Sequence, residues 1–220
     1  MQFTHRRLLV YIALFFLVSI GVVFHVFTRV DLMVLSWIQS SVPDSLDRLL
    51  SVFSLIGSFE VLTFFLFIFL FPKDRALFFR VFAVYLMGLG IEIFMKYFFV
   101  HVGPPRIFHR YDLPFLFPTS SFHPGYSFPS GHSYRSVFVV YILLSKLNLF
   151  KLDKPINTLI RIKAILFIVL MLVSRISLGE HWPSDVVGGA LLGVVAAEAS
   201  LVSENHVFFR GQKKRQKKKE

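Results

Sequence analysis

Long apolar stretches decide what this chain can fold into. Six of them are close in length to the roughly 20 residues that cross the hydrocarbon core of a bilayer as a helix, at residues 8–27, 49–71, 76–100, 133–150, 159–178 and 186–202. The chain of 220 residues is 55% hydrophobic, contains 28 Phe and has a mean hydropathy of +0.66. A soluble domain of this size has no interior large enough for so much apolar surface. We therefore predict an all-α polytopic membrane protein with six transmembrane helices.

A segment of a different kind follows the first span, "DLMVLSWIQSSVPDSLD" at residues 31–47. Asp31 is expected to cap a short helix, and Trp37 suits the membrane–water interface, so we predict a helix that lies on the outer membrane surface. The first span is too long for a signal peptide and lacks a small-residue cleavage site, so it is expected to be retained. The pattern indicates no strand, repeat or second large domain. Residues 1–209 are therefore predicted to form a single membrane domain.

The basic residues indicate an orientation in the membrane. With both termini on one side, that side holds 17 of the 24 Lys and Arg residues and the other side holds seven. Cytoplasmic loops carry the excess of positive charge, so both termini are predicted to be cytoplasmic. The long loop 101–128 and the turn "GEHWPSD" at residues 179–185 then lie together on the outer face.

Residues 210–220, "RGQKKRQKKKE", contain seven of the Lys and Arg residues that give the chain its net charge of +11. Beside a membrane domain, such a run predicts a disordered cytoplasmic tail that binds anionic lipid head groups, and no nucleic-acid partner. The chain has no Cys, so disulfides and thiolate metal sites are excluded. No group of His or carboxylate residues has metal-ligand spacing, so we predict neither a metal site nor a cofactor.

The loop 101–128 is rich in Pro and aromatic residues and is long enough to indicate a lid or binding loop. Directly after it, "PSGH" at residues 129–132 has the features of a helix start, because Pro129 breaks the preceding segment and Ser130 is a good capping residue. The backbone N–H groups of Gly131 and His132 would lie at the positive end of this helix and could bind an anion. Gly131 would also let a ligand approach the backbone closely. An ordinary helix cap would look the same.

The stretch "SRISLGEHWPSD" at residues 174–185 places charged and imidazole side chains between two apolar spans. Asp185 lies four residues after His181, about one helical turn away, and could accept the Nδ1 proton of that imidazole. The Nε2 lone pair would then be free to attack an electrophile. The planar guanidinium of Arg175 suits two phosphate oxygens.

Further basic residues fall on the predicted outer face. Lys96 is either a phosphate ligand or an interfacial lysine whose stem lies in the lipid, and Glu92, one turn earlier, could hold it in place. Arg106 adds a cation in the loop. Arg135 lies one turn after His132 and is either a phosphate or diphosphate contact or an interfacial side chain. The loop histidines are expected to be solvated: His101, His109 and His123.

These residues resemble the signature motifs of the type-2 phosphatidic acid phosphatase superfamily. "PSGH" is similar to the second motif, and "SR" at 174–175, followed by His181 and Asp185 at the family's spacing, is similar to the third. The first motif departs from the pattern of a Lys, six residues and then Arg-Pro. Here nine residues separate Lys96 from Arg106, and Ile107 replaces the Pro. Arg110 is therefore an alternative to Arg106.

The resemblance implies a metal-independent phosphatase that passes through a phosphohistidine. By position, His181 is the nucleophile, Asp185 orients it, and His132 protonates the leaving oxygen. The residues implied to bind the phosphoryl oxygens are Lys96, Arg106, Ser130, Gly131 and Arg175. In-line phosphoryl transfer needs positioning and compensation of negative charge, which cations and helix-end amides provide.

A site at the membrane boundary favours a lipid phosphate or diphosphate as substrate, of the undecaprenyl diphosphate, phosphatidylglycerol phosphate or phosphatidic acid type, in a bacterial inner membrane. The alternatives are a lipid A phosphatase, a phosphotransferase that passes the phosphoryl group to another lipid or a sugar, and a membrane transporter. A transporter would use charges along a path through the membrane, whereas these charges cluster at its boundary. Vanadate-dependent haloperoxidases share the motifs, but such an apolar chain argues against that activity.

Overall fold

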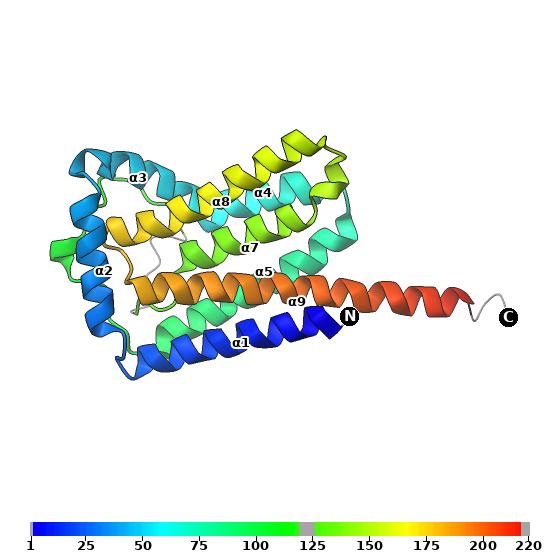
Figure 1. Ribbon diagram of the computed structural model, residues 1–220, viewed down its shortest axis with the longest axis horizontal. Helices are drawn as coiled ribbons and strands as arrows, with labels where there is room; N and C mark the ends of the chain where they lie inside the picture. The colour runs from blue at the N-terminus through cyan, green and yellow to red at the C-terminus, as the bar shows by residue number, and fades with distance from the viewer. Residues whose placement is uncertain (1, 119–125, 217–220) are drawn as a thin grey trace.

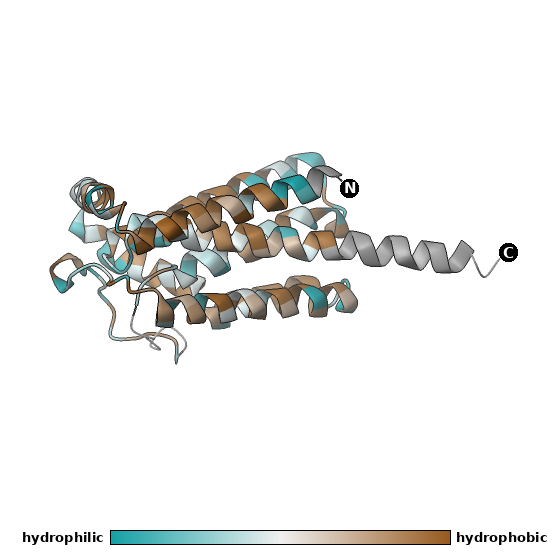
Figure 2. Ribbon diagram, turned by 90° about the horizontal axis from the view of Figure 1, so that it is seen from below, coloured by the Kyte–Doolittle hydropathy of each residue, from teal (hydrophilic) through white to brown (hydrophobic). Residues whose placement is uncertain are grey.

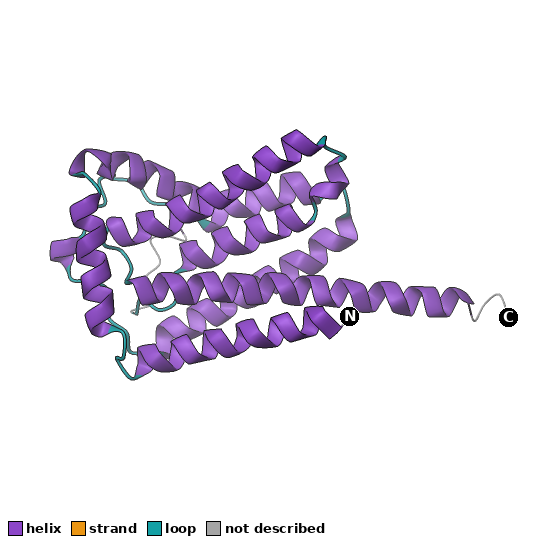
Figure 3. Ribbon diagram, in the orientation of Figure 1, coloured by secondary structure: helices purple, strands orange, loops and turns teal. Residues whose placement is uncertain are grey.

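The computed structural model describes residues 2–118 and 126–216. These residues form helices and loops and contain no strand, as the all-α prediction requires (Figure 3). The helices are α1 (Gln2–Val23), α2 (Thr28–Ser41), α3 (Asp47–Ser54), α4 (Phe59–Leu70), α5 (Arg75–Phe98), α7 (Gly131–Ser145), α8 (Lys154–Ser177) and α9 (Pro183–Gln216) (Figure 1).

Helix α7 lies at the centre of the bundle, and α9 packs closely along it. Two glycines of α9 make this approach possible. A Cβ atom at Gly189 would collide with the carbonyl oxygen of Ser130, and one at Gly193 would lie 2.7 Å from the carbonyl oxygen of Tyr134. On its other side α7 is fixed to α5, because the buried hydroxyl of Tyr134 donates to the carbonyl oxygen of Tyr85. The beginning of α7 therefore has a fixed position relative to α5 and α9.

The helices expose apolar side chains along most of their length. Figure 2 shows hydrophobic residues over the middle of the bundle and hydrophilic residues gathered toward its two ends. Large aliphatic and aromatic side chains are exposed on α1 and α8, among them Phe16, Ile20, Ile162, Leu166 and Val169. An exposed apolar surface of this extent indicates contact with lipid.

Four helices in the described part of the chain are long and apolar enough to cross a membrane: His5–Val23, Arg75–Phe98, Lys154–Ser177 and Pro183–Val202. The predicted span 49–71 is not one straight helix. It is divided between Asp44–Gly57 and Phe59–Leu70, which meet at 53° and make a fifth span only if they count together. The break has a local cause, because Ser58 caps α4 and its hydroxyl oxygen accepts from the backbone N–H of Val61 at 3.4 Å.

The predicted span 133–150 corresponds to α7, which has 15 residues. At about 1.5 Å per residue it is roughly 22 Å long, shorter than the hydrocarbon core of a bilayer. Six full-length spans are therefore not confirmed. The short helix is surrounded by the others, and ten of its residues are buried, so its apolar side chains mostly contact protein.

Helix α2 crosses the ends of α8 and α9 (Figure 1). Its buried face contains Leu35 and Ile38, whereas Trp37 is 68% exposed. The prediction that Asp31 caps this helix is wrong, because the helix begins at Thr28. The buried carboxylate of Asp31 instead accepts hydrogen bonds from the backbone N–H and the hydroxyl of Ser184, at 2.8 and 2.7 Å. Asp31 thus ties α2 to the first turn of α9.

Helix α9 extends well past the predicted end of the last span at residue 202. Its backbone stays helical through Gln216, so the expected disordered tail is instead helical over residues 210–216. Lys, Arg and Gln have high helix propensity, which lets the helix continue beyond the apolar stretch.

Candidate active site

The predicted site residues gather at one end of the bundle, where α5 and α8 end and α7 and α9 begin (Figure 1). Lys96 lies in the last turn of α5 and Arg175 in the last turn of α8. Gly131 and His132 open α7, and Asp185 lies in the first turn of α9. Helix ends separated widely in sequence therefore bring the three motif regions together.

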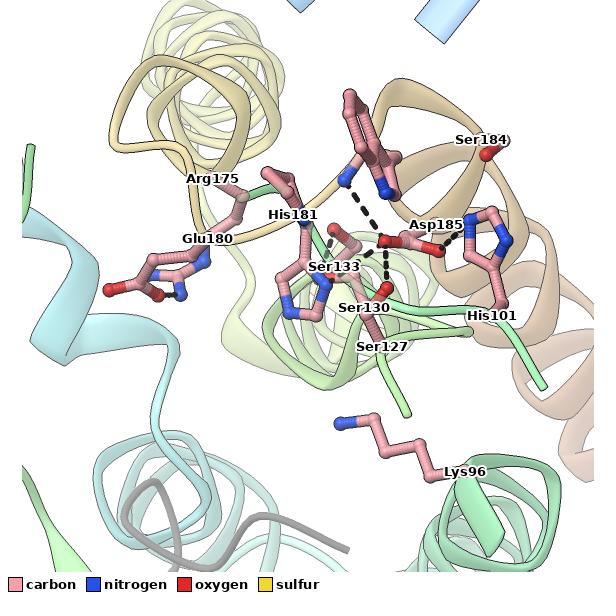
Figure 4. A network of polar contacts seen from close by, with 12 residues as sticks. Lys96, His101, Ser127, Ser130, Ser133, Arg175, Glu180, His181, Ser184 and Asp185 are labelled. Carbon is pink, nitrogen blue, oxygen red and sulfur yellow. Dashed lines mark hydrogen bonds and ion pairs between the residues drawn. The ribbon is translucent and has the colours of Figure 1, made fainter. Parts of the chain in front are cut away.

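The His181 and Asp185 side chains face each other. His181 Nδ1 lies 3.5 Å from Asp185 Oδ2 (Figure 4). Asp185 is completely buried, and its Oδ2 accepts hydrogen bonds from the backbone N–H of Trp182 at 2.9 Å and the hydroxyl of Ser127 at 2.6 Å. The contact with His181 does not have the geometry of a hydrogen bond. Pro183 at the first position of α9 suits a helix start, which places Asp185 one turn from His181. The arrangement leaves Nε2 on the side of the ring away from Asp185.

Two cations share one buried carboxylate. Glu92 Oε1 lies 2.9 Å from Lys96 Nζ, and Glu92 Oε2 lies 3.0 Å from Arg135 Nη1. Arg135 is only 6% exposed and its Nε donates to the carbonyl oxygen of Gly57 at 3.4 Å. Arg135 is therefore an interior residue, and the alternative of an interfacial side chain is wrong. The three ionised groups together carry a charge of +1.

Gly131 leaves the space that this ion-pair network occupies. A Cβ atom at residue 131 would collide with Glu92 Oε1 and lie 2.7 Å from Arg135 Nη1. Ser130 is the N-cap residue of α7, but its side chain caps no backbone N–H, contrary to expectation. Its hydroxyl accepts from Ser133 Oγ at 3.0 Å, and its backbone N–H donates to the carbonyl oxygen of Asp185 at 3.0 Å. The start of α7 is thus fixed to the start of α9.

Arg175 is buried and pairs with the carboxylate of Glu180 (Figure 4). The turn after α8 makes this possible, because the backbone N–H groups of Glu180 and His181 both donate to the carbonyl oxygen of Arg175, at 3.2 and 3.3 Å. Gly179 in this turn has a φ of +67°, and a Cβ atom there would collide with the carbonyl oxygen of Phe108. Only glycine adopts this conformation readily in so little space.

The two histidines share one cationic environment. Burial and the positive charges of Lys96 and Arg175 lower the pKa of His181 well below its ordinary value. The imidazole is therefore neutral at pH 7. His132 lies within electrostatic range of His181 and of the same cations, and its ring packs beside Gly57, where a Cβ atom would lie 2.8 Å from His132 Cδ2.

Arg106 and Arg110 lie outside this cluster. Arg106 is exposed in the short 3-10 helix Arg106–Phe108, and no described residue forms an ion pair or side-chain hydrogen bond with it. Arg110 anchors the loop to the segment between α2 and α3. It pairs with Asp44 and Asp47, both at 2.7 Å, and donates to the carbonyl oxygen of Gln39 at 3.0 Å. The structure thus places neither arginine beside the other residues that are predicted to bind the phosphate.

His101 was expected to be solvated, and this prediction is wrong. Its side chain is 12% exposed, and its Nε2 lies 3.3 Å from Asp185 Oδ1. The sequence gives no signal for this contact, nor for the one between Ser127 and Asp185, because both depend on how the loop folds back. His109 is exposed, and His123 lies outside the described residues. In the described part of the chain, no group of three His, Asp or Glu residues could hold a metal ion.

Comparisons with known proteins indicate the family to which the chain belongs. The sequence profile of the PAP2 superfamily matches residues 75–206, which include every predicted site residue. A PAP2-type phosphatidylglycerolphosphate phosphatase from Bacillus subtilis has a similar crystal structure, with a TM-score of 0.72 and 16% identity over 91% of this chain and 96% of the other. LpxE from Aquifex aeolicus is similar with a TM-score of 0.51 and 26% identity, over 77% of this chain and 93% of the other. Curated protein sequences gave no match. The chain is an integral membrane protein that belongs to the PAP2 superfamily.

Proposed function

We propose that this protein is a lipid phosphatase that removes a terminal phosphate from a membrane lipid through a phosphohistidine on His181. The observation that carries the proposal is a neutral, buried imidazole held between a carboxylate and a group of cations. Asp185 faces Nδ1 of His181, while Lys96 and Arg175 lie near enough for their charges to act on the ring. A neutral imidazole beside positive charge is suited to attack a phosphorus atom whose oxygens are negatively charged.

The reaction proceeds in two steps. In the first, Nε2 of His181 attacks phosphorus as the bond to the lipid oxygen breaks, and His132, as an imidazolium, gives that oxygen a proton. Burial and the nearby cations lower the pKa of His132 in the free enzyme, and the negative charge of the bound phosphate offsets those cations so that His132 takes up this proton when the substrate binds. In the second, water attacks the phosphohistidine while His132 takes up a proton, which releases inorganic phosphate and restores His181. Asp185 stabilises the Nδ1–H of the imidazole throughout, because this proton keeps Nε2 as the attacking atom. No step needs a metal ion.

The phosphoryl oxygens contact the cations and the start of α7. Arg175 offers a planar pair of N–H groups, and Lys96 offers an ammonium group. Ser130 and the backbone N–H of Gly131 add donors at the positive end of the helix dipole. Arg135 acts indirectly: it pairs with the same Glu92 carboxylate as Lys96 and so adds positive charge near the phosphate-binding residues. Arg106 would need a different loop arrangement to take part.

A lipid substrate suits the position of the site. The gathered residues lie at the end of a bundle whose sides expose apolar side chains. With those sides in lipid, the site would lie close to the depth of a phosphate on a membrane lipid. The two similar solved structures are a phosphatidylglycerolphosphate phosphatase and LpxE. We therefore propose a prenyl diphosphate or a glycerolipid phosphate as the substrate. Capture of the same phosphohistidine by a lipid alcohol or a sugar would instead make the enzyme a phosphotransferase.

The site is proposed to face outward from a bacterial cytoplasmic membrane. The N-terminal end of α1 and the C-terminal end of α9 lie at the opposite end of the bundle (Figure 1). In the proposed orientation the cytoplasmic side holds 17 of the 24 Lys and Arg residues, including the basic residues 210–220 that we propose contact anionic head groups. The same charge distribution supports cytoplasmic termini.

Phosphate release by the purified protein in detergent tests this function. The substrates are phosphatidic acid, phosphatidylglycerol phosphate, undecaprenyl diphosphate and lipid A, each incubated with EDTA and with His181→Ala protein as a control. Release of phosphate from at least one lipid by wild type, and none by His181→Ala, is the expected result. Transfer of a labelled phosphate from the substrate to an added lipid alcohol would identify a phosphotransferase. No release or transfer from any of the lipids would contradict the proposal.

A further inference from the structure

The Asp185 carboxylate has partners on both of its oxygens. Oδ2 faces His181 and accepts the hydrogen bonds from Trp182 and Ser127. Oδ1 is buried and forms no hydrogen bond of good geometry. Among the described residues, the side chain that faces it is His101, with Nε2 at 3.3 Å (Figure 4). Asp185 thus lies between two histidines, one on each oxygen.

Several contacts hold His101 in this position. Its carbonyl oxygen accepts a hydrogen bond from the backbone N–H of Ser127 at 2.9 Å, so the two ends of the long loop meet beside Asp185. The imidazole lies edge-on to the ring of Phe128, with ring centroids 6.4 Å apart. The indole N–H of Trp182 donates to the carbonyl oxygen of the next residue, Val102, at 2.8 Å. These contacts hold the backbone at His101 and one side of its ring, which favours the direction of Nε2 toward Asp185.

The burial of Asp185 makes this contact important. A buried carboxylate oxygen without a hydrogen-bond donor is costly, because the oxygen has lost its water. His101 can supply the missing donor when its proton is on Nε2, and a small rotation of either side chain would complete the bond. Burial lowers the pKa of His101, although Asp185 acts in the opposite direction, so the ring is neutral and has one N–H donor, which we assign to Nε2 because that nitrogen faces Oδ1.

His101 also lines a half-open pocket. This pocket of about 240 Å³ lies at the outer end of the bundle and is lined by His101 together with His25, Thr28, Asp31, Val100, Val102 and Trp182. A side chain at residue 101 that fills less space would let water reach Oδ1 from this pocket. Water would compete for the carboxylate and allow it to rotate away from His181.

We propose that His101 is a positioning residue, whose Nε2–H holds Asp185 Oδ1 so that Oδ2 stays directed at His181 Nδ1. The inference rests on the proposed function, because it assigns a role to a partner of Asp185 in that reaction. His101 itself does not contact the phosphoryl group. Its effect is therefore on the rate of the chemical step and not on the binding of the lipid phosphate.

Three variants separate this role from a merely structural one. His101→Leu removes the donor and keeps similar bulk, and His101→Gln keeps an N–H donor at a similar reach. His109→Leu is the matched control, because His109 is an exposed histidine of the same loop whose ring contacts the carbonyl oxygen of Pro104 and not Asp185. We expect His101→Leu to lower kcat about tenfold or more, equivalent to about 1.4 kcal/mol, with KM changed less than about threefold. His101→Gln should recover most of kcat, and His109→Leu should equal wild type.

A double-mutant cycle then tests whether His101 acts through Asp185. If it does, His101→Leu combined with Asp185→Asn should be no slower than Asp185→Asn alone. Wild-type kcat in His101→Leu, no recovery in His101→Gln, or losses that multiply in the double variant would each overturn the inference. Thermal unfolding in detergent identifies folded protein, and His101→Met replaces His101→Leu if the latter aggregates. Activity retained by His181→Ala would instead overturn the proposed function, which is a separate outcome.

Discussion

The carboxylate of Glu180 pairs with the guanidinium of Arg175, the buried arginine that we propose binds the substrate phosphate. Glu180 is the residue directly before His181, and the turn after α8 brings both of them back to Arg175. A phosphate that binds Arg175 must therefore displace this carboxylate or share the guanidinium with it. The pair keeps a buried guanidinium compensated, at the expense of competition with the substrate.

Glu180→Gln should tighten the binding of phosphate-like anions. The substitution keeps the shape of the side chain and removes the negative charge that competes for Arg175. We expect the inhibition constant of vanadate to fall about threefold to tenfold, which is about 0.7 to 1.4 kcal/mol. Asp44→Asn is the control, because Asp44 is an acidic residue that pairs with Arg110 away from the cluster. An unchanged or larger inhibition constant in Glu180→Gln would show that this carboxylate does not compete.

Gly131→Ala should disrupt the cation network. The added Cβ would collide with the Glu92 carboxylate and crowd Arg135, both of which are buried. We expect a loss in kcat/KM of about tenfold or more, on the order of 1.4 kcal/mol in transition-state stabilisation. Gly90→Ala, in α5 two residues before Glu92 and on the opposite side of the helix, is the control because a Cβ there has nothing within 4 Å. It should keep wild-type activity and unfold at the same or a slightly higher temperature. Equal activity of the two variants would rule out the steric argument.

The pH dependence of kcat/KM should reflect the pKa of His181. Nucleophilic attack needs the neutral imidazole, and burial with the charges of Lys96 and Arg175 lowers its pKa. Activity should therefore persist below pH 6.5 and fall only when the pH drops through the lowered value. Lys96→Met removes one of these charges and should raise the pKa of His181. The fall in kcat/KM on the acid side of the profile (the acid limb) should then occur at higher pH. Comparing both proteins on one substrate cancels the ionisation of the substrate itself. A limb that stays in place or moves to lower pH would contradict the assignment.

Single-cysteine variants test the orientation, because the natural chain contains no Cys. Ile107 is 86% exposed beside the site, and Lys154 is exposed at the start of α8 at the other end of the bundle. A membrane-impermeant maleimide should label Ile107→Cys in intact cells and label Lys154→Cys only after lysis. The opposite pattern would place the site in the cytoplasm.

Local spacing explains which parts of the site could be predicted from the sequence. Glu92 and Lys96 are four residues apart on one helix, and so are His181 and Asp185 across a helix start, so their proximity follows from helix geometry. His101 and Asp185 are brought together by the fold of a long loop and could not be paired in this way. The contact between Asp31 and Ser184, 153 residues apart, is of the same kind.

Apolar composition likewise predicted helices better than it predicted spans. The stretch 49–71 contains enough apolar residues for one span, but the cap at Ser58 and the 3-10 turn before it bend the chain by 53°. Helix α7 is apolar because it lies at the centre of the bundle, and its 15 residues are fewer than the roughly 20 of a full-length span. Burial in protein and burial in lipid favour the same residues, so hydropathy alone does not separate the two.

The central claim is that His181 carries the phosphoryl group. The direct measurement is a rapid acid or base quench of the enzyme with a lipid substrate labelled on its terminal phosphate, followed by separation of the protein from the lipid. The wild-type protein should carry a label that survives base and is lost in acid, as expected for a phosphohistidine, and His181→Ala should carry none and release no phosphate. Normal phosphate release by folded His181→Ala, or turnover by the wild type without any protein-bound label in the first turnover, would contradict the account.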